Sequence, residues 1–529
     1  MAAAPVITDS PSAVKGARAA SEIDADALLF IVAEAHGFGT VAPAKLGRQV
    51  EGRGIAATLL CLGEGARCRG RQFLAVGHGG FPCITLNPAN LGKVKHLNKT
   101  RRTAHAAGSG KRMESGDPAR QGALRLLQAV EEGATLDEAS GLTEALPPSA
   151  RARARRLALE VLRRGDRADA LLAPMLARKP RPDIRRILRL ATVEMLALGE
   201  APHGAVNAAV TLCRGLGGKG QAAAGMVNAV LRKVAAAGDD WAALQPRRLP
   251  DWLRGPVAGQ WGEAVAMAIE AAHEAGAPLD LTPKSGEAPG EALPTGSFRQ
   301  PAGTQVSALP GYEAGEWWVQ DAAAALAVRV LDPQPGERIA DLCAAPGGKT
   351  MQLAAAGAEV VALDISESRL ARVAENLDRS QLSAQLVAAD ALEWRPDVAL
   401  DAILLDAPCS ATGTIRRHPE LPLIRDGSAL PGLVELQARL IDHALEILRP
   451  GGRLVYATCS LLPAEGEDQI AAALARHPEV EIEPAEAPGI DPAWLTPEGA
   501  LRLRPDLWPD RGGMDGFFIA RLRKRLAKS

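Results

Sequence analysis

Two cysteines, each followed by a serine, stand at equivalent points of the C-terminal half of the chain. Cys409 comes shortly after a predicted buried strand over 401–405, and Cys459 comes after a predicted strand over 453–457. A single cysteine is usually an inert buried thiol. Because neighbouring parallel strands end at the edge where open α/β sheets bind ligands, two thiols at such ends favour catalysis. The chemistry open to them is nucleophilic attack by a thiolate.

A glycine-containing turn lies upstream of both cysteines. Residues 339–342 predict a short buried strand, Pro346-Gly347-Gly348 predicts a tight turn, and a helix follows. This arrangement offers backbone N–H groups and a helix N-terminus to a ligand. Gly348-Lys349-Thr350 matches the end of a phosphate-binding P-loop, but Cys343 occupies the position of its first glycine. With no Gly-x-Gly-x-x-Gly either, a nucleoside without a pyrophosphate remains, and S-adenosylmethionine fits that description.

Acidic residues close the successive strands of this region. Asp364 ends a predicted strand over 359–363 and suits two ribose hydroxyls, while Asp390 follows 385–388 and suits an adenine edge. Asp406 follows the strand over 401–405. Any one of them reads more simply as a helix N-cap. An acid after every strand instead indicates a ligand site along the sheet edge.

Three segments carry a resemblance to a known family. They are Cys343-Ala344-Ala345-Pro346-Gly347-Gly348-Lys349, Asp406-Ala407-Pro408-Cys409-Ser410 and Tyr456-Ala457-Thr458-Cys459-Ser460. Together they resemble the RNA 5-methylcytosine methyltransferases, and most of all the bacterial 16S ribosomal RNA enzymes with an N-terminal NusB-like domain. The resemblance covers roughly residues 117–523.

The resemblance implies roles for these residues. Cys459 would be the nucleophile that adds to C6 of cytosine, and Cys409 would assist product release. Asp406 is the natural partner for N3 of the base and also lies in the cofactor site. Lys349 would orient the substrate or the cofactor carboxylate, and Cys343 would pack beside the cofactor. The implied cofactor is S-adenosyl-L-methionine, bound by Cys343, Ala344, Ala345, Pro346, Gly347, Gly348, Lys349, Asp364, Asp390 and Asp406.

Other functions fit the residues less well. An adenine amino-methyltransferase would need an Asn/Asp-Pro-Pro-Tyr/Phe loop where this chain has Asp406-Ala407-Pro408-Cys409. A DNA cytosine-5 enzyme would use a Pro-Cys pair, which leaves Cys459 unexplained. An RNA-binding scaffold with an inactive methyltransferase domain predicts degraded motifs, and these are intact. A 5-methylcytosine enzyme acting on another RNA, such as tRNA, stays open.

Composition limits the class of protein. The 529 residues suggest two to four domains, and 47% hydrophobic residues allow large cores. A formal net charge of −1 means that any nucleic-acid contact depends on local basic patches. Seven cysteines without paired spacing indicate free thiols in a reducing compartment, so we expect a cytoplasmic protein. Neither a signal peptide nor an apolar run of about 18 residues is found, which predicts no membrane span.

Four regions follow one another along the chain. Residues 1–112 are rich in Gly and Arg, with cysteines spaced unlike zinc ligands, so no metal site is predicted. We expect this extension, of unknown role, to be disordered or to reflect a start codon assigned too early, with Met113 as the true beginning. Residues 117–238 predict an all-α bundle, in which 149–164 and 167–178 read as separate helices, and this bundle resembles NusB-type RNA-binding domains. A small α+β lobe over 245–318 is implied by the resemblance, and the sequence predicts a strand near 305–307 within it. Residues 319–525 predict an α/β Rossmann-like, doubly wound methyltransferase domain, with a helix over 322–331 before its first strand.

Basic residues gather in the predicted bundle. Two arginine-rich runs cover 151–167 and 178–189, with few acids between their members. Such runs usually form a solvated face paired with acids, but their density favours RNA phosphate binding. Arg416, Arg417 and His418, in the loop after the strand over 401–405, are further candidates for phosphate contacts, or simply an exposed loop.

Overall fold

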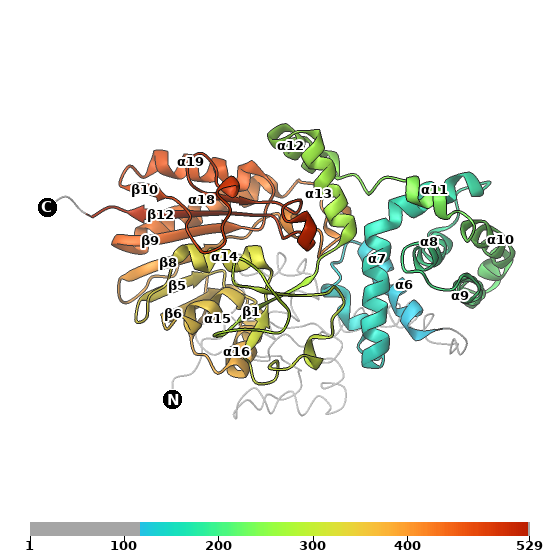
Figure 1. Cartoon of the computed structure of the whole chain (residues 1–529), viewed down its shortest axis with the longest axis horizontal. Coiled ribbons are helices and arrows are strands. Elements are labelled where there is room, and N and C mark those ends of the chain that lie inside the picture. The colour runs from blue at the N-terminus through green and yellow to red at the C-terminus, as the bar shows by residue number, and fades with distance from the viewer. Residues whose placement is uncertain (1–116, 527–529) are drawn as a thin grey trace, which may run out of the picture. The chain divides into compact units, whose positions relative to one another are not determined.

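The computed structural model describes residues 117–526 (Figure 1). The expectations for residues 1–112 lie outside this part. A helical bundle comes first, then a small lobe, then a domain built on a larger sheet. The predicted classes, an all-α domain followed by a Rossmann-like α/β domain, are confirmed.

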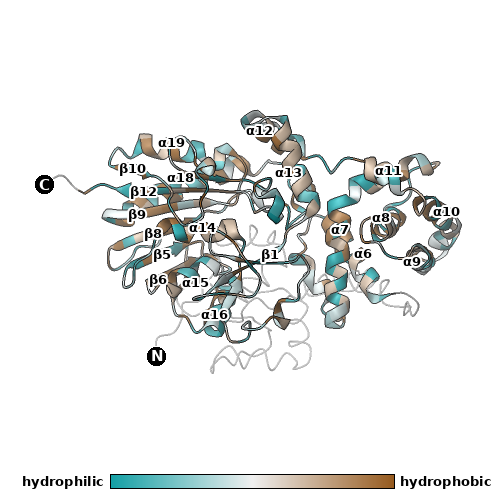
Figure 2. Cartoon of the chain, in the orientation of Figure 1, coloured by the Kyte–Doolittle hydropathy of each residue, from teal (hydrophilic) through white to brown (hydrophobic). Residues whose placement is uncertain are grey.

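The bundle consists of six α-helices and two short 3-10 segments among the described residues. They are α6 (Pro118–Glu131), η1 (Glu138–Thr143), α7 (Pro148–Leu172), η2 (Ala173–Met175), α8 (Pro182–Leu196), α9 (Pro202–Gly215), α10 (Gly218–Val234) and α11 (Gly238–Ala243). Asp117 caps α6 by accepting a hydrogen bond from the backbone N–H of Ala119. Apolar faces of these helices form one core, and the alternating colours around α7 in Figure 2 show its amphipathic character.

The separate helices expected over 149–164 and 167–178 are wrong, because α7 runs through Gly165 without a break. Glycine inside a helix costs about 1 kcal/mol relative to alanine. Burial of Leu162 on one side and of Leu171 and Leu172 on the other offsets that cost. Gly165 is itself buried, with the Arg189 side chain packed over it.

The lobe combines two helices with a four-stranded antiparallel sheet of order β2-β3-β1-β4. Its elements are α12 (Asp251–Trp261), α13 (Glu263–Ala275), β1 (Leu279–Pro283), β2 (Glu291–Ala292), β3 (Phe298–Gln300), η3 (Val306–Ala308) and β4 (Trp317–Val319). A strand expected near 305–307 is wrong, since that stretch forms the 3-10 turn η3. The α+β character of the lobe agrees with the expectation.

The large sheet has the order β10-β12-β9-β8-β5-β6-β7, with β11 paired to β12. Its strands are β5 (Arg338–Leu342), β6 (Glu359–Asp364), β7 (Gln385–Ala388), β8 (Leu400–Asp406), β9 (Leu448–Thr458), β10 (Val480–Glu483), β11 (Leu501–Leu503) and β12 (Phe517–Lys524). Strands β5 to β9 are parallel, while β10, β11 and β12 pair antiparallel. The sheet is therefore mixed, with a parallel centre and an antiparallel edge, and β11 was not predicted.

The last domain also contains six α-helices among the described residues. They are α14 (Ala322–Leu331), α15 (Gly348–Ala355), α16 (Glu367–Ser380), α17 (Leu421–Ile424), α18 (Leu430–Ile447) and α19 (Glu467–Arg476), with η4 (Thr412–Thr414), η5 (Pro463–Glu465), η6 (Pro492–Trp494) and η7 (Pro509–Arg511) in the loops. Alternate residues of β8 take part in different cores: Ile403 packs with α18, and Leu404 packs with α14, so these two helices cover opposite faces of the sheet. This period of two is why the central strands read as continuous apolar runs.

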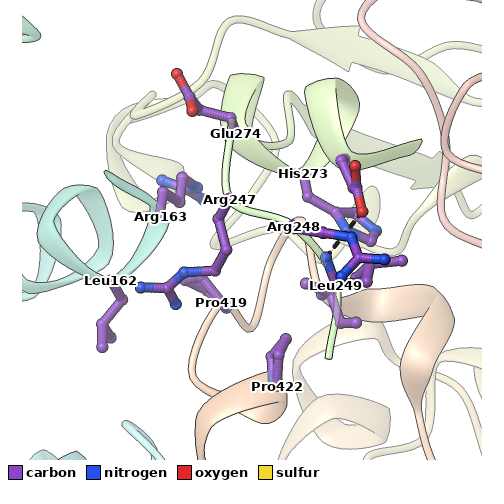
Figure 3. A pocket seen from close by; sticks show the side chains of 11 residues that line it. Leu162, Arg163, Arg247, Arg248, Leu249, His273, Glu274, Pro419 and Pro422 are labelled. Carbon is purple, nitrogen blue, oxygen red and sulfur yellow. Dashed lines mark hydrogen bonds between the residues drawn. The ribbon is translucent and has the colours of Figure 1, made fainter. Parts of the chain in front are cut away.

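A cavity of about 20 Å³ lies where α7, α13 and the loop after β8 meet (Figure 3). His273 of α13 lines it and is buried, and neither ring nitrogen has a hydrogen-bond partner among the described residues. Burial, aided by the charge of Arg416, lowers the pKa of His273 to about 3. The imidazole is therefore neutral in the folded protein at any pH near neutrality.

This buried histidine makes stability depend on pH. The unfolded chain binds a proton on His273 below about pH 6.5 and the folded chain does not, so the contribution is complete above pH 6.5 and is lost towards pH 3. At pH 5.0 the folded state should lose about 2 kcal/mol relative to pH 7.5. Urea unfolding of the parent and of His273→Leu at both pH values measures this change in the free energy of unfolding. The variant should lose less stability than the parent between pH 7.5 and pH 5.0. An exposed control, His203→Gln, should follow the parent; equal losses in parent and His273→Leu would contradict the prediction.

Among the described helices, none combines the length and apolar character that a membrane crossing requires.

Candidate active site

The two cysteines meet at one edge of the large sheet. Strands β8 and β9 are parallel neighbours with Asp406 in register with Ala457, so the chain leaves both strands at the same edge. Cys409 lies three residues beyond the end of β8, and Cys459 directly follows β9. Their Sγ atoms are 3.4 Å apart, and both residues are half-buried. The hydrogen bond with Cys459 and burial together raise the pKa of Cys409 well above its ordinary value.

Lys349 and Asp406 form an ion pair beside these thiols. The Lys349 Nζ donates to Asp406 Oδ2 at 2.7 Å and lies 5.4 Å from the centre of the Phe517 ring. Burial works against the charge of Lys349, but the carboxylate of Asp406, with smaller contributions from Asp341 and Cys459, holds the pKa above its ordinary value. The Lys349 ammonium therefore keeps its positive charge beside the two thiols.

The predicted cofactor turn joins β5 to α15. Cys343 adopts a left-handed backbone with φ 63°, and Gly347 does so with φ 99°. A Cβ on Gly347 would lie 2.9 Å from Val373 of α16, so only glycine fits there. The backbone N–H of Ala345 donates to Asp364 Oδ2 at 3.2 Å, which connects the turn to the end of β6. Burial, together with the charges of Asp406, Asp364 and Asp341, raises the pKa of Cys343 to about 12, so its thiol stays protonated.

The outer members of the predicted site are less closely connected. Asp364 is buried and accepts from the Ser366 N–H, and Arg369 pairs with it at 3.2 Å. Asp390 lies beyond β7, half-buried, and accepts from the Leu392 N–H in a turn, since no helix begins there. Cys409, Cys459, Lys349 and Asp406 thus form the compact part of the site, with Asp364 one strand away from the turn and Asp390 two.

The charges around the turn fit a cationic nucleoside. Asp341 of β5 is fully buried, and its Oδ1 has no hydrogen-bond partner among the described residues. Burial and the nearby Asp406 and Asp364 raise the pKa of Asp341 to about 7. Lys349 and Arg369 already pair with Asp406 and Asp364, so the Oδ1 of Asp341, unpartnered in the described part of the chain, is the acceptor left for a ligand with positive charge. S-adenosylmethionine carries a sulfonium and an ammonium group, so the residues present fit it.

The loop after β8 corrects one expectation. Arg416, considered as a phosphate contact, is fully buried and pairs with Asp321 at 2.7 Å and with Asp515 at 2.9 Å. Arg417 pairs with the other oxygen of Asp515 and keeps a partly exposed side chain. His418 lies 3.6 Å from Glu420. Arg416 is therefore a structural residue that fixes the loop between β8 and α17.

Two acids near the site were not predicted. Asp515 holds Arg416 from 99 residues further along the chain, and no sequence pattern connects them. Glu465 lies six residues after Cys459 and accepts hydrogen bonds from residues next to both cysteines. Its closeness to Cys459 in sequence was the only available signal.

Replacing Arg416 by methionine should destabilise the protein by about 3–5 kcal/mol, because Asp321 and Asp515 would remain buried as uncompensated charges. Chemical denaturation measures the loss. Arg449→Met is the matched control, since Arg449 pairs with Asp401 at a solvent-exposed position and should cost less than about 1 kcal/mol. Equal losses in the two variants would contradict the structural role of Arg416.

Most arginines of the two bundle runs pair with acids. Those in ion pairs are Arg153, Arg155, Arg163, Arg164, Arg167, Arg181, Arg185, Arg186 and Arg189. The carboxylates compete with phosphate for these guanidinium groups, so the two runs do not form the continuous phosphate-binding surface that their density favoured. Arg151, Arg156, Arg178 and Lys179 are exposed and remain candidates for RNA contact.

Comparison with family models gives two matches along the chain. Residues 117–236 match the NusB family, and residues 328–523 match the family described as 16S rRNA methyltransferase RsmB/F. In fold, the chain is similar to a solved structure titled "Crystal Structure of PH0851", with a TM-score of 0.58 and 24% identity. That likeness covers 78% of this chain and all but 1% of the other.

The similarity to curated relatives covers nearly the whole length of those proteins. Ribosomal RNA small subunit methyltransferase B of Xylella fastidiosa (strain 9a5c) is 37% identical over 438 residues, which is 76% of this chain and 99% of the relative. The protein of the same name from Xanthomonas campestris pv. campestris is 35% identical over 442 residues, 78% of this chain and 98% of the relative. The chain therefore belongs to the ribosomal RNA small subunit methyltransferase B family, a family of S-adenosylmethionine-dependent RNA methyltransferases.

Proposed function

We propose that the protein transfers a methyl group from S-adenosylmethionine to C5 of a cytosine in RNA, and that this RNA is 16S ribosomal RNA. The observation that carries the proposal is the pair of thiols, Cys409 and Cys459, 3.4 Å apart beside the Lys349–Asp406 ion pair. The name shared by the relatives supports ribosomal RNA of the small subunit as the substrate.

The protein must supply a nucleophile of its own, because C5 of cytosine is too weak a nucleophile to take the methyl group unaided. In the proposed reaction the Cys459 thiolate bonds to C6, which turns C5 into an enamine-like carbon. The bound cofactor supplies an electrophilic methyl group on its sulfonium sulfur. Loss of the C5 proton to a base and cleavage of the C6–S bond then restore the C5=C6 double bond and the free thiolate.

The residues around the thiols suit the other requirements. A proton shared between Asp406 and N3 of the base would offset the negative charge that develops at N3 when sulfur adds to C6. Lys349 holds Asp406 in place by donating to its Oδ2 and keeps a positive charge in the site. Cys409, kept protonated by its raised pKa, lies next to the sulfur that must be expelled.

For the cofactor, we assign the turn from Cys343 to Lys349 with Asp364, Asp390 and Asp406. Gly347 and Gly348 allow close approach of backbone to ligand, and Asp364 would take the ribose hydroxyls. We assign 117–238 to RNA binding, with Arg151, Arg156, Arg178 and Lys179 as phosphate contacts, 245–318 to a lobe beside the RNA path, and 319–525 to catalysis.

The test is incubation of the protein with labelled S-adenosylmethionine and either an unmodified 16S transcript or unmodified tRNA, followed by mapping of 5-methylcytosine. Label at C5 of cytosine in the 16S transcript is the expected result. Label found only in tRNA would show that tRNA is the substrate, and it would leave the proposed chemistry unchanged. Label on a ring nitrogen, an amino group or ribose would overturn the chemistry.

A further inference from the structure

A buried carboxylate connects the two cysteine-bearing loops from behind. Glu465 of η5 is fully buried, and its side chain accepts hydrogen bonds from both Cys-Ser pairs. Its Oε1 accepts from the Ser410 N–H at 2.8 Å, and its Oε2 accepts from the Ser460 hydroxyl at 2.5 Å and from the Ser410 hydroxyl. Ser410 follows Cys409 and Ser460 follows Cys459, so one carboxylate holds the residue next to each thiol.

Further hydrogen bonds fix this carboxylate and occupy its remaining acceptor sites. The backbone carbonyl of Glu465 accepts from the Tyr456 hydroxyl at 2.9 Å and the Thr458 hydroxyl at 3.0 Å, which fixes it to β9. The Gln437 amide of α18 donates to Glu465 Oε1 at 3.0 Å and to the carbonyl of Pro408 at 2.8 Å. Four donors use the roughly four lone-pair sites of a carboxylate. Glu465 therefore has no free acceptor for a substrate proton, which excludes it as a general base in this arrangement.

We propose that Glu465 is a positioning residue that sets the separation and orientation of the Cys409 and Cys459 thiols. The inference rests on the proposed function, because it assigns Glu465 a role in the step that uses both thiols. Neither loop belongs to a strand at its cysteine, so the strand ladder ends before the sulfur atoms are placed. Strand β8 ends at Asp406 and strand β9 ends at Thr458. Beyond these residues, the Glu465 carboxylate joins the two cysteine-bearing loops.

The charge of Glu465 adds a second effect. The Cys459 hydrogen bond and burial raise the pKa of Cys409 most, and the nearby carboxylate of Glu465 raises it further. An uncharged residue of the same shape at position 465 should therefore make the Cys409 thiol more acidic. This gives a readout that does not need RNA.

Glu465→Gln keeps the shape of the side chain but replaces one acceptor by an amide donor. We expect the kcat of methyl transfer to fall roughly a hundredfold, as for a misplacement of about 1 Å, with the cofactor Kd unchanged. We also expect iodoacetamide to alkylate Cys409 about threefold faster at pH 8, when followed by mass spectrometry against the alkylation of Cys459. Glu446→Gln, at an exposed position paired with Arg395, is the control and should change neither quantity.

Glu465→Asp separates geometry from charge. The shorter side chain keeps the carboxylate but withdraws it by one methylene, so kcat should fall while the alkylation rate of Cys409 stays near that of the parent. Unchanged kcat in both variants, or an unchanged ratio of Cys409 to Cys459 alkylation in Glu465→Gln, overturns the inference. If Glu465→Gln does not fold, loss of kcat in folded Glu465→Asp supports the role and parental kcat in it overturns the role. If the parent protein forms no 5-methylcytosine, the proposed function is wrong. The alkylation rates of Cys409 and Cys459 then still decide whether Glu465 controls the thiols.

Discussion

Cys459→Ala should lose methyl transfer almost completely, with kcat lowered by about four to six orders of magnitude, as when a covalent nucleophile is removed from an enzyme. Cys459 is the thiol that directly follows β9, with the charge of Lys349 close by. Without its sulfur no bond to C6 forms, and C5 stays too weak a nucleophile to accept a methyl group. Single-turnover transfer of labelled methyl to the 16S transcript measures the loss.

Two controls separate lost chemistry from lost structure. Cofactor binding by calorimetry should be unchanged, since Cys459 lies outside the turn from Cys343 to Lys349. Cys213→Ser removes a thiol from α9 in the bundle and keeps a donor for the Gly220 carbonyl, so it should transfer methyl at the parental rate. Residual transfer by Cys459→Ala above about a hundredth of that rate would show that another group acts as nucleophile.

Cys409→Ala should transfer one methyl group and then stall as a covalent protein–RNA adduct. Its thiol lies 3.4 Å from Cys459 Sγ and is the sulfur nearest to the bond that must break. With that group removed, we expect multiple-turnover kcat to fall by about 10²–10⁴-fold, the range typical of a lost acid–base group. Denaturing electrophoresis of labelled RNA should show a shifted band that survives heating in detergent.

The double variant tests the identity of the bond. Cys409→Ala combined with Cys459→Ala should form no adduct, because the sulfur that bonds to C6 is gone. An adduct in the double variant would place the covalent bond on another residue. Turnover by Cys409→Ala equal to that of the parent would remove Cys409 from the mechanism.

Local signals in the sequence predicted several elements closely. The helix expected over 322–331 is α14, because Asp321 supplies an N-cap that accepts from the Ala323 N–H and an unbroken apolar run follows. The turn at Pro346-Gly347-Gly348 was also predictable, since its glycines suit backbone that other residues avoid. The strands were recognisable from short apolar runs ended by acids.

Elements that depend on distant contacts were harder. The Gly165-Asp166 pair reads locally as a break, but burial of the surrounding leucines carries α7 through it. Arg416 reads as an exposed loop cation, yet two acids, 95 residues before it and 99 residues after it, neutralise it in the interior. The arginines of the bundle read as a phosphate surface, and their acidic partners include Asp117, Glu200 and Glu274, which lie well apart in sequence.

By itself, the sequence determined which groups are available for chemistry: two Cys-Ser pairs, a glycine turn and acids at the ends of three strands, because these depend on residue type and short spacing. Tertiary structure alone decided that the thiols of Cys409 and Cys459, 50 residues apart, lie 3.4 Å from each other with Lys349 and Asp406 beside them. It also decided that Glu465 joins their loops. The physical reason is that the register of parallel strands and buried hydrogen bonds between distant loops set these distances, and neither leaves a periodic signal in the chain.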